Sequence, residues 1–138
     1  MFKQGPIPAF VHGVVEYLAA ALFIAAPFLF SFDDDTATAV SIVVGVLILI
    51  LTASTALPTG LIKSIPVQAH AVIDFALAAV LIAAPFLFGF SDDGTATAFF
   101  IVLGVVHLLM TIATRFVSEA PPRRPRPADS SRSGSGPA

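Results

Sequence analysis

Two histidine and acid pairs stand four residues apart in this sequence, His12 with Glu16 and His70 with Asp74. Residues four apart lie on one face of a helix, so each imidazole shares a face with its carboxyl group. Such groups can move protons, ligate a metal ion or hydrogen-bond neighbouring helices. A third histidine, His107, lies in a similarly apolar stretch. These five residues are the candidate intramembrane polar cluster, called here the His/carboxyl cluster.

Four apolar segments carry these residues: 9–32, 37–57, 67–90 and 96–114. Each has about 20 residues, which as a helix would cross the roughly 30 Å hydrocarbon core of a bilayer. The chain is 57% apolar and 12% charged, whereas a soluble domain carries about 25% charged residues. The sequence therefore predicts an all-α, multi-pass membrane protein, a bundle of four transmembrane helices.

The second half of the chain repeats the first. Residues 7–35 align with 65–93, and 36–55 align with 95–114, with more than half of the paired positions identical. Each unit is a two-helix hairpin that crosses the membrane twice, so both copies enter from the same side. The two units are therefore parallel repeats, related by a pseudo-two-fold axis along the membrane normal.

Basic residues all fall on one side of a four-span chain: Lys3, Lys63, Arg115, Arg123, Arg124, Arg126 and Arg132. Lysine and arginine near membrane spans favour the cytoplasmic side, so both termini are predicted to be cytoplasmic. The tail is rich in Arg, Pro and Ser and is predicted to be disordered. The expected organisation is a cytoplasmic N-terminal segment 1–6, a first repeat 7–57, a cytoplasmic loop 58–64, a second repeat 65–117 and a disordered cytoplasmic tail 118–138.

The helix starts have recognisable signals. Pro8 and Pro66 suit the first turn of a helix, where a missing N–H costs nothing. Thr36 and Thr95 follow the acidic turns and are predicted to cap the second helix of each unit through their hydroxyl groups.

Proline and glycine mark matching positions inside the helices. Pro27 and Pro85 lie late in the first helix of each repeat, where each removes a hydrogen bond and is predicted to kink the helix. Gly45 and Gly104 lie in the second helix of each repeat. Small residues let membrane helices approach closely, so both glycines are predicted to pack against other helices.

Depth along the helices predicts how the His/carboxyl cluster is arranged. Glu16 and Asp74 lie about 12 Å into their helices, and His107, which enters from the opposite side, reaches the same depth. His12 and His70 are expected one helical turn nearer the cytoplasm. Ionisable groups facing lipid cost several kcal/mol, so all five should face the inside of the bundle.

Several interpretations of the cluster remain open. Hydrogen bonding that holds the first helices of the two repeats together is favoured. Proton or ion handling is the next interpretation, because carboxyl and imidazole groups make up intramembrane relays. Metal binding and haem ligation by His12 and His70 are weaker interpretations, because HExxH spacing and further haem-contact signatures are absent. No metal and no cofactor are therefore expected.

The blocks APFLFSF and APFLFGF, each preceded by HxxxE or HxxxD and an Ile-Pro start, resemble the SPW repeat family of small bacterial membrane proteins. The resemblance covers about residues 7–116. The family signature is Ser-Pro-Trp, where this sequence has Ala26-Pro27-Phe28 and Ala84-Pro85-Phe86. The resemblance implies a location in the bacterial inner membrane and implies no activity.

The predicted function is that of a structural or accessory membrane component with a buried His/carboxyl cluster. The alternative is a small proton- or ion-conducting channel or transporter that uses Glu16, Asp74 and the histidines. No enzyme is expected, since the sequence has no nucleophile elbow, phosphate loop or thiol. The expected partners are the lipid bilayer and either a second copy of the chain or another membrane protein, with no role for nucleic acid.

Overall fold

Four long helices make up most of the computed structural model, which describes residues 5–116. They are α1 (Ala9–Leu29), α2 (Asp35–Ala53), α3 (Val67–Leu87) and α4 (Gly94–Ala113), with short strands β1 (Ile7–Pro8) and β2 (Thr114–Arg115). All four helices are long and apolar enough to cross a membrane. The predicted all-α, four-helix fold is confirmed, while the tail 118–138 lies outside the described residues.

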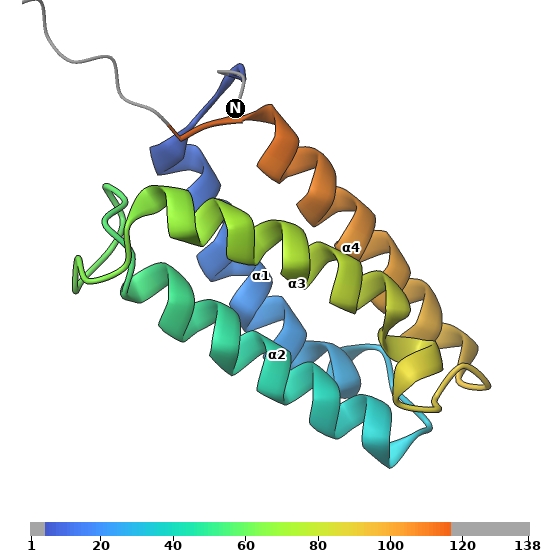
Figure 1. The fold of residues 1–138 in the computed structure, drawn as a ribbon. Helices are drawn as coiled ribbons and strands as arrows, with labels where there is room; N and C mark the ends of the chain where they lie inside the picture. The colour runs from blue at the N-terminus through green and yellow to red at the C-terminus, as the bar shows by residue number, and fades with distance from the viewer. Residues whose placement is uncertain (1–4, 117–138) are drawn as a thin grey trace, which may run out of the picture.

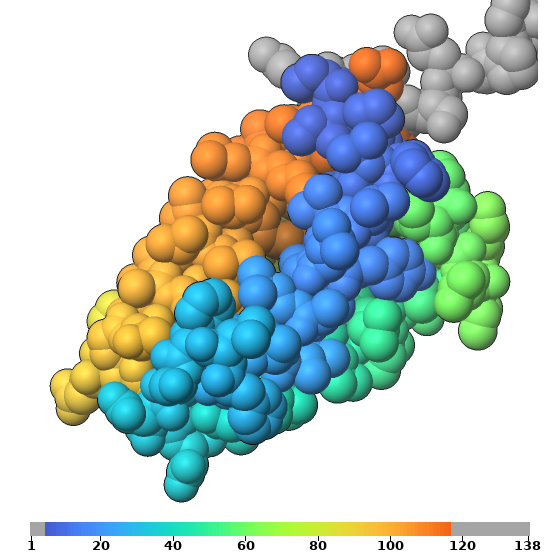
Figure 2. Space-filling model, turned by 180° about the vertical axis from the view of Figure 1, so that it is seen from behind, coloured from blue at the N-terminus to red at the C-terminus, as the bar shows by residue number. Residues whose placement is uncertain are grey.

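The helices form two hairpins that lie side by side. The start of α1, the end of α4 and the α2–α3 connection lie at one end of the bundle. The two short turns, residues 30–34 between α1 and α2 and 88–93 between α3 and α4, lie at the other end (Figure 1). Seen from behind, α1 runs between α4 and α2 (Figure 2). Backbone contact is close within each hairpin and sparse between hairpins. Side chains therefore make most of the contact between the repeats.

Apolar side chains fill the half of the bundle next to the short turns. Three phenylalanine rings meet there, with centroids 5.6 Å apart for Phe23 and Phe100 and 5.1 Å apart for Phe90 and Phe100. The buried members of this core are Ala20, Phe23, Ala37, Val44, Ile48, Leu81, Ala84, Phe90, Ala96 and Phe100. The opposite half of the bundle holds the His/carboxyl cluster, whose residues are all buried.

Glycine allows close contact within each hairpin. A Cβ atom added to Gly45 would lie 2.7 Å from the carbonyl oxygen of Ala20, and one added to Gly104 would lie 2.8 Å from Ile82 Cγ1. Both distances are shorter than a carbon atom tolerates. The structure thus places both glycines against the first helix of their own hairpin.

Aspartate, and not threonine, caps the second helix of each repeat. Asp34 and Asp93 accept hydrogen bonds, each of 2.9 Å, from the backbone N–H three residues further along. The predicted caps Thr36 and Thr95 lie two residues too late, inside the helix, so that prediction is wrong. The N-cap side chain must reach the free N–H groups of the first turn from just outside it.

The prolines before α1 and α3 also lie one residue earlier than predicted. Pro8 and Pro66 occupy the N-cap positions with extended backbone, at ψ 146° and 143°. They therefore end the extended segment that leads into each helix. The first helical turn begins at the next residue.

The late prolines lie within the last turn of α1 and α3. Pro27 has no N–H to donate to the carbonyl oxygen of Phe23, four residues earlier. The hydroxyl of Ser41 donates to that oxygen at 2.6 Å. A side chain from α2 thus replaces the hydrogen bond that Pro27 removes. The predicted kinks at Pro27 and Pro85 remain predictions.

Two short parallel pairings join the repeats at the end of the bundle where α1 begins and α4 ends. Ile7 in β1 pairs with Thr114 in β2, and Ile65 makes the matching bridge with Thr55. A residue just before the first helix of each repeat thus pairs with a residue just after the second helix of the other repeat. This exchange brings a threonine of one repeat beside the first helix of the other.

At the opposite end a single aspartate joins the two short turns. Asp93 Oδ1 caps α4, and Asp93 Oδ2 accepts from the backbone N–H groups of Asp33 at 2.8 Å and Asp34 at 3.1 Å. Burial acts to raise the pKa of Asp93, but the N–H groups of Ala96, Asp34 and Asp33 together lower this pKa below its ordinary value. The sequence analysis gave Asp93 no such role.

Candidate functional site: a buried cluster between the repeats

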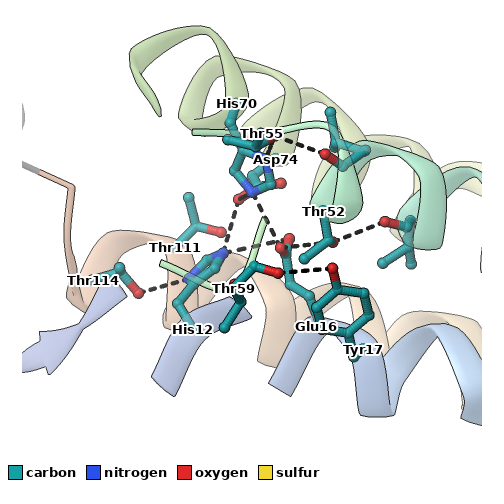
Figure 3. Close-up of polar contacts among 12 residues, drawn as sticks. His12, Glu16, Tyr17, Thr52, Thr55, Thr59, His70, Asp74, Thr111 and Thr114 are labelled. Carbon is teal, nitrogen blue, oxygen red and sulfur yellow. Dashed lines mark hydrogen bonds and ion pairs between the residues drawn. The ribbon is translucent and has the colours of Figure 1, made fainter. Parts of the chain in front are cut away.

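The five residues of the His/carboxyl cluster come together in the structure. His12 and Glu16 extend from α1 toward His70 and Asp74 from α3, as Figure 3 shows, and His107 extends from α4. The first four side chains are fully buried and His107 is 6% exposed. The cluster therefore has almost no contact with the surroundings of the protein.

The two histidines of the first helices each approach both carboxyl groups. His12 Nε2 lies 3.4 Å from Glu16 Oε1 and 3.1 Å from Asp74 Oδ2. His70 Nε2 lies 3.2 Å from Glu16 Oε2 and 3.2 Å from Asp74 Oδ2. Each imidazole thus contacts the acid of its own repeat and the acid of the other. The arrangement follows the pseudo-two-fold relation between the repeats.

The outer nitrogen of each histidine meets a threonine hydroxyl from the opposite repeat. His12 Nδ1 lies 2.7 Å from Thr114 Oγ1, and His70 Nδ1 lies 2.8 Å from Thr55 Oγ1. These threonines are the ones that the two parallel pairings carry across the repeat boundary. Backbone pairing therefore sets the position of both imidazole rings.

Hydrogen-bond donors and acceptors fix which nitrogen of each ring carries hydrogen. The Thr114 hydroxyl donates to Met110 O at 2.6 Å, and the Thr55 hydroxyl donates to Leu51 O at 2.7 Å. A hydroxyl has one hydrogen to donate, so both contacts are satisfied only if histidine Nδ1–H donates to the threonine oxygen. In the neutral ring the Nε2 atom then carries a lone pair and faces the carboxyl groups.

This arrangement requires positive charge at the centre of the cluster. A lone pair on Nε2 and a carboxylate oxygen at 3.1 to 3.4 Å repel each other unless a proton or a cation lies between them. Two ionised carboxylates also leave two negative charges on fully buried side chains. Two protons or one divalent cation would balance them.

Neighbouring groups complete the site. Thr52 Oγ1 lies 2.9 Å from Glu16 Oε2 and 2.8 Å from Ile48 O, and it can donate its one hydrogen to only one of these acceptors at a time. The ring of Phe116 packs edge-on against His12 with the two centroids 5.0 Å apart. Leu57, at the matching place in the first repeat, is also fully buried. The centroid of the Phe116 ring also lies 6.4 Å from that of His70, so this ring covers both histidines at the end of the bundle where α1 begins and α4 ends.

One cluster residue breaks the symmetry between the repeats. His107 occupies the position that Ile48 holds in the first repeat. Its Nε2 lies 3.6 Å from Asp74 Oδ1, and neither atom has a hydrogen-bond partner among the described residues. Asp74 thus has a third imidazole beside it that Glu16 lacks.

Sequence analysis missed the threonines that orient the cluster. Thr55 and Thr114 are identical at paired positions, as are Thr52 and Thr111. Identity of a polar residue within an apolar repeat was a signal that could have singled them out. Which histidine each threonine meets depends on the crossed pairing, which the sequence pattern does not contain.

Fold and site together define a small multi-pass membrane protein made of two helical hairpins around one buried polar centre. A family model described as the SPW repeat domain matches residues 10–114, so the chain belongs to the SPW repeat family. No curated protein and no solved structure matches the chain. The resemblance noted in the sequence is thereby confirmed.

Proposed function

We propose that this protein is a structural or accessory component of the bacterial inner membrane, in which the His/carboxyl cluster joins two hairpins into one unit. The observation that carries the proposal is the crossed bonding of the cluster. Each imidazole contacts a threonine and a carboxyl group of the other repeat. Because backbone contact between the hairpins is sparse, these polar contacts supply much of their association.

Conduction of protons or ions is the less supported function. A conducting path would have to connect the cluster to both membrane surfaces. Phe116 and Leu57 are buried at one side of the cluster, and the apolar core around Phe23 and Phe100 lies at the other. A structural role requires no such path, and no enzymatic role is part of the proposal.

The orientation proposed places both termini in the cytoplasm. The α2–α3 connection, which contains Lys63, and β2, which contains Arg115, lie at one end of the bundle, and the acidic turns lie at the other end (Figure 1). Reporter fusions after Asp35 and Asp93 should behave as external, and fusions after Lys63 and at Ala138 as internal. An external signal from either of the last two would contradict this orientation.

The joining role is tested by removing one cross-repeat acceptor at a time. Thr55→Val and Thr114→Val keep the shape of the side chain and leave a buried histidine N–H without its partner. Each should lower the free energy of unfolding in detergent by about 1 kcal/mol. Thr36→Val, at an exposed position, is the matched control and should have little effect.

Two outcomes would overturn the proposal. Unchanged stability in both buried variants would show that the cluster does not join the repeats. Proton or cation flux through vesicles that hold the purified protein, above that of empty vesicles and lost in Glu16→Gln and Asp74→Asn, would favour conduction.

A further inference from the structure

We propose that the His/carboxyl cluster is a binding site for one divalent transition-metal ion, of which Zn²⁺ is the best match. The ligands are His12 Nε2, His70 Nε2, the Glu16 carboxylate and Asp74 Oδ2. A metal atom at this place goes beyond the joining role, because it adds a specific ligand to the centre of the bundle. The four ligand atoms lie within 4.8 Å of one another.

Distances between the ligand atoms match tetrahedral coordination. A metal ion bound at about 2.0 Å by four tetrahedral ligands places neighbouring ligand atoms about 3.3 Å apart. The four nitrogen–oxygen distances in the cluster are 3.1, 3.2, 3.2 and 3.4 Å. The two distances to Glu16 end at different oxygens of its carboxylate, and the four ligand atoms lie up to 4.8 Å apart, so the side chains must close in to receive the ion.

The orientation of the rings is that of metal ligands. A histidine that binds a metal through one nitrogen usually donates its other N–H to an acceptor that fixes the ring. The Nδ1–H groups of His12 and His70 donate to Thr114 and Thr55, which directs the Nε2 lone pairs to the centre. On the acid side, the Thr52 hydroxyl lies within hydrogen-bond distance of Glu16 Oε2, at 2.9 Å.

His12 Nε2 has hydrogen-bond geometry to Asp74 Oδ2 at 3.1 Å, but two other atoms of the cluster have no such partner and favour a metal site over a set of ion pairs. Both carboxylate oxygens beside His70 Nε2 lie at 3.2 Å, yet this nitrogen makes no hydrogen bond within the described residues. Glu16 Oε1 also lacks a hydrogen-bond partner there. Both atoms are fully buried. An imidazolium N–H would need an acceptor in line, whereas a coordinating nitrogen points between the oxygens to the ion.

Charge and ligand type select the ion. Two carboxylates and one divalent cation sum to zero, which makes the loaded centre compatible with a low-dielectric environment. Imidazole ligands favour transition metals, whereas Mg²⁺ and Ca²⁺ prefer oxygen ligands. His107 lies beside Asp74 Oδ1 at 3.6 Å and would orient this carboxylate without being required as a ligand.

The test uses the full chain without an affinity tag, purified in detergent, treated with a chelator and reloaded. With Zn²⁺, elemental analysis should find one ion per chain, and the midpoint of thermal unfolding should rise. With Co²⁺, visible absorption should show the strong bands of a tetrahedral site. Mg²⁺ should produce neither effect.

Substitutions of cluster residues test whether the ion binds in the cluster. His12→Asn and Glu16→Gln should each weaken Zn²⁺ binding by at least tenfold, because each removes one ligand or one charge. His107→Ile, which introduces the residue of the first repeat, should retain one ion per chain. The increase in thermal stability should vanish with binding in the first two variants.

Other outcomes would overturn the proposal. Wild-type protein that takes up no Zn²⁺ after reloading refutes it whether or not the variants fold. Equal binding by the wild type and the His12→Asn variant would place the ion elsewhere, and weak octahedral Co²⁺ bands would contradict the ligand set. In none of these cases would the joining role of the threonines be affected, because it is measured without metal.

Discussion

The two repeats of this protein share the histidine and the threonine that join them, and differ in the joining acid and at other positions. His12 matches His70, and Thr55 matches Thr114, so both halves of the crossed bonding use the same residues. Among the differing positions are Glu16 with Asp74, Ile48 with His107, and Ser41 with Phe100. The comparison separates what the pseudo-symmetric fold requires from what one half adds to it.

One physical reason explains why the joining histidines and threonines are identical in the two repeats. A polar group buried in a membrane must find a partner, and each histidine finds its partners in the other repeat. A change in one repeat alone would leave a group of the other unsatisfied. Positions of difference, such as Ile48 and His107, lie beside the shared contacts and are free to differ.

The largest effect is expected at the matched glycines. Gly45→Leu and Gly104→Leu would each force a side chain into the backbone or side chain of the neighbouring helix. Each should lower the free energy of unfolding by about 3 kcal/mol, to a similar extent in both repeats. Gly94→Leu is the control, because a Cβ there would meet no atom within 4 Å. Thermal unfolding in detergent measures the stability of all three variants. An unchanged stability in Gly45→Leu, with a loss in Gly104→Leu, would contradict the equal packing role of the two glycines.

A smaller and unequal effect is expected at the two helix caps. Asp34 caps α2 alone, whereas Asp93 caps α4 and also accepts from both N–H groups of the other turn. Asp93→Asn should lower the free energy of unfolding by about 1 to 2 kcal/mol, and Asp34→Asn by less. Equal losses would mean that the bond between the turns adds nothing.

The contribution of Asp93 to stability should depend on pH. Its folded pKa lies below the ordinary value of 3.8, so its contribution to stability is present above that value and is lost as the pH falls through the folded pKa. Wild-type stability should therefore fall below about pH 4 more steeply than that of Asp93→Asn. Parallel curves of unfolding free energy against pH would contradict the assigned bonds.

The smallest effect is expected at the carbonyl oxygen that Pro27 leaves without a backbone donor, because a serine donates to it in the first repeat only. Ser41 donates to the Phe23 carbonyl that Pro27 leaves free, and Phe100 stands at the matching position of the second repeat. Ser41→Ala should lower the free energy of unfolding by about 0.6 kcal/mol, a typical value for a hydrogen bond between membrane helices. Ser54→Ala in the α2–α3 connection serves as the control, and an equal loss there would remove the special role of Ser41.

Sequence patterns predicted the parts of this structure that depend on local chemistry. The apolar segments located four helices, and the repeat with its histidine and acid spacing located the five residues that meet in the cluster. Competing polar residues led to the errors at the helix starts, because Asp34 and Thr36 are both good caps and only the backbone geometry selects one. The crossed pairing of Ile7 with Thr114 joins residues from the two ends of the bundle, and no local pattern encodes it.

The central claim is that the histidine of each repeat donates from Nδ1–H to a threonine of the other repeat. The most direct test is to measure which ring nitrogen of His12 and of His70 carries hydrogen. Nitrogen-15 NMR of histidine side chains in the full protein distinguishes the two ring nitrogens. We expect protonated Nδ1 in both His12 and His70, with Thr114→Val altering the His12 signal and leaving that of His70 in place. A neutral ring with hydrogen on Nε2 and a bare Nδ1, in either histidine, would contradict the account.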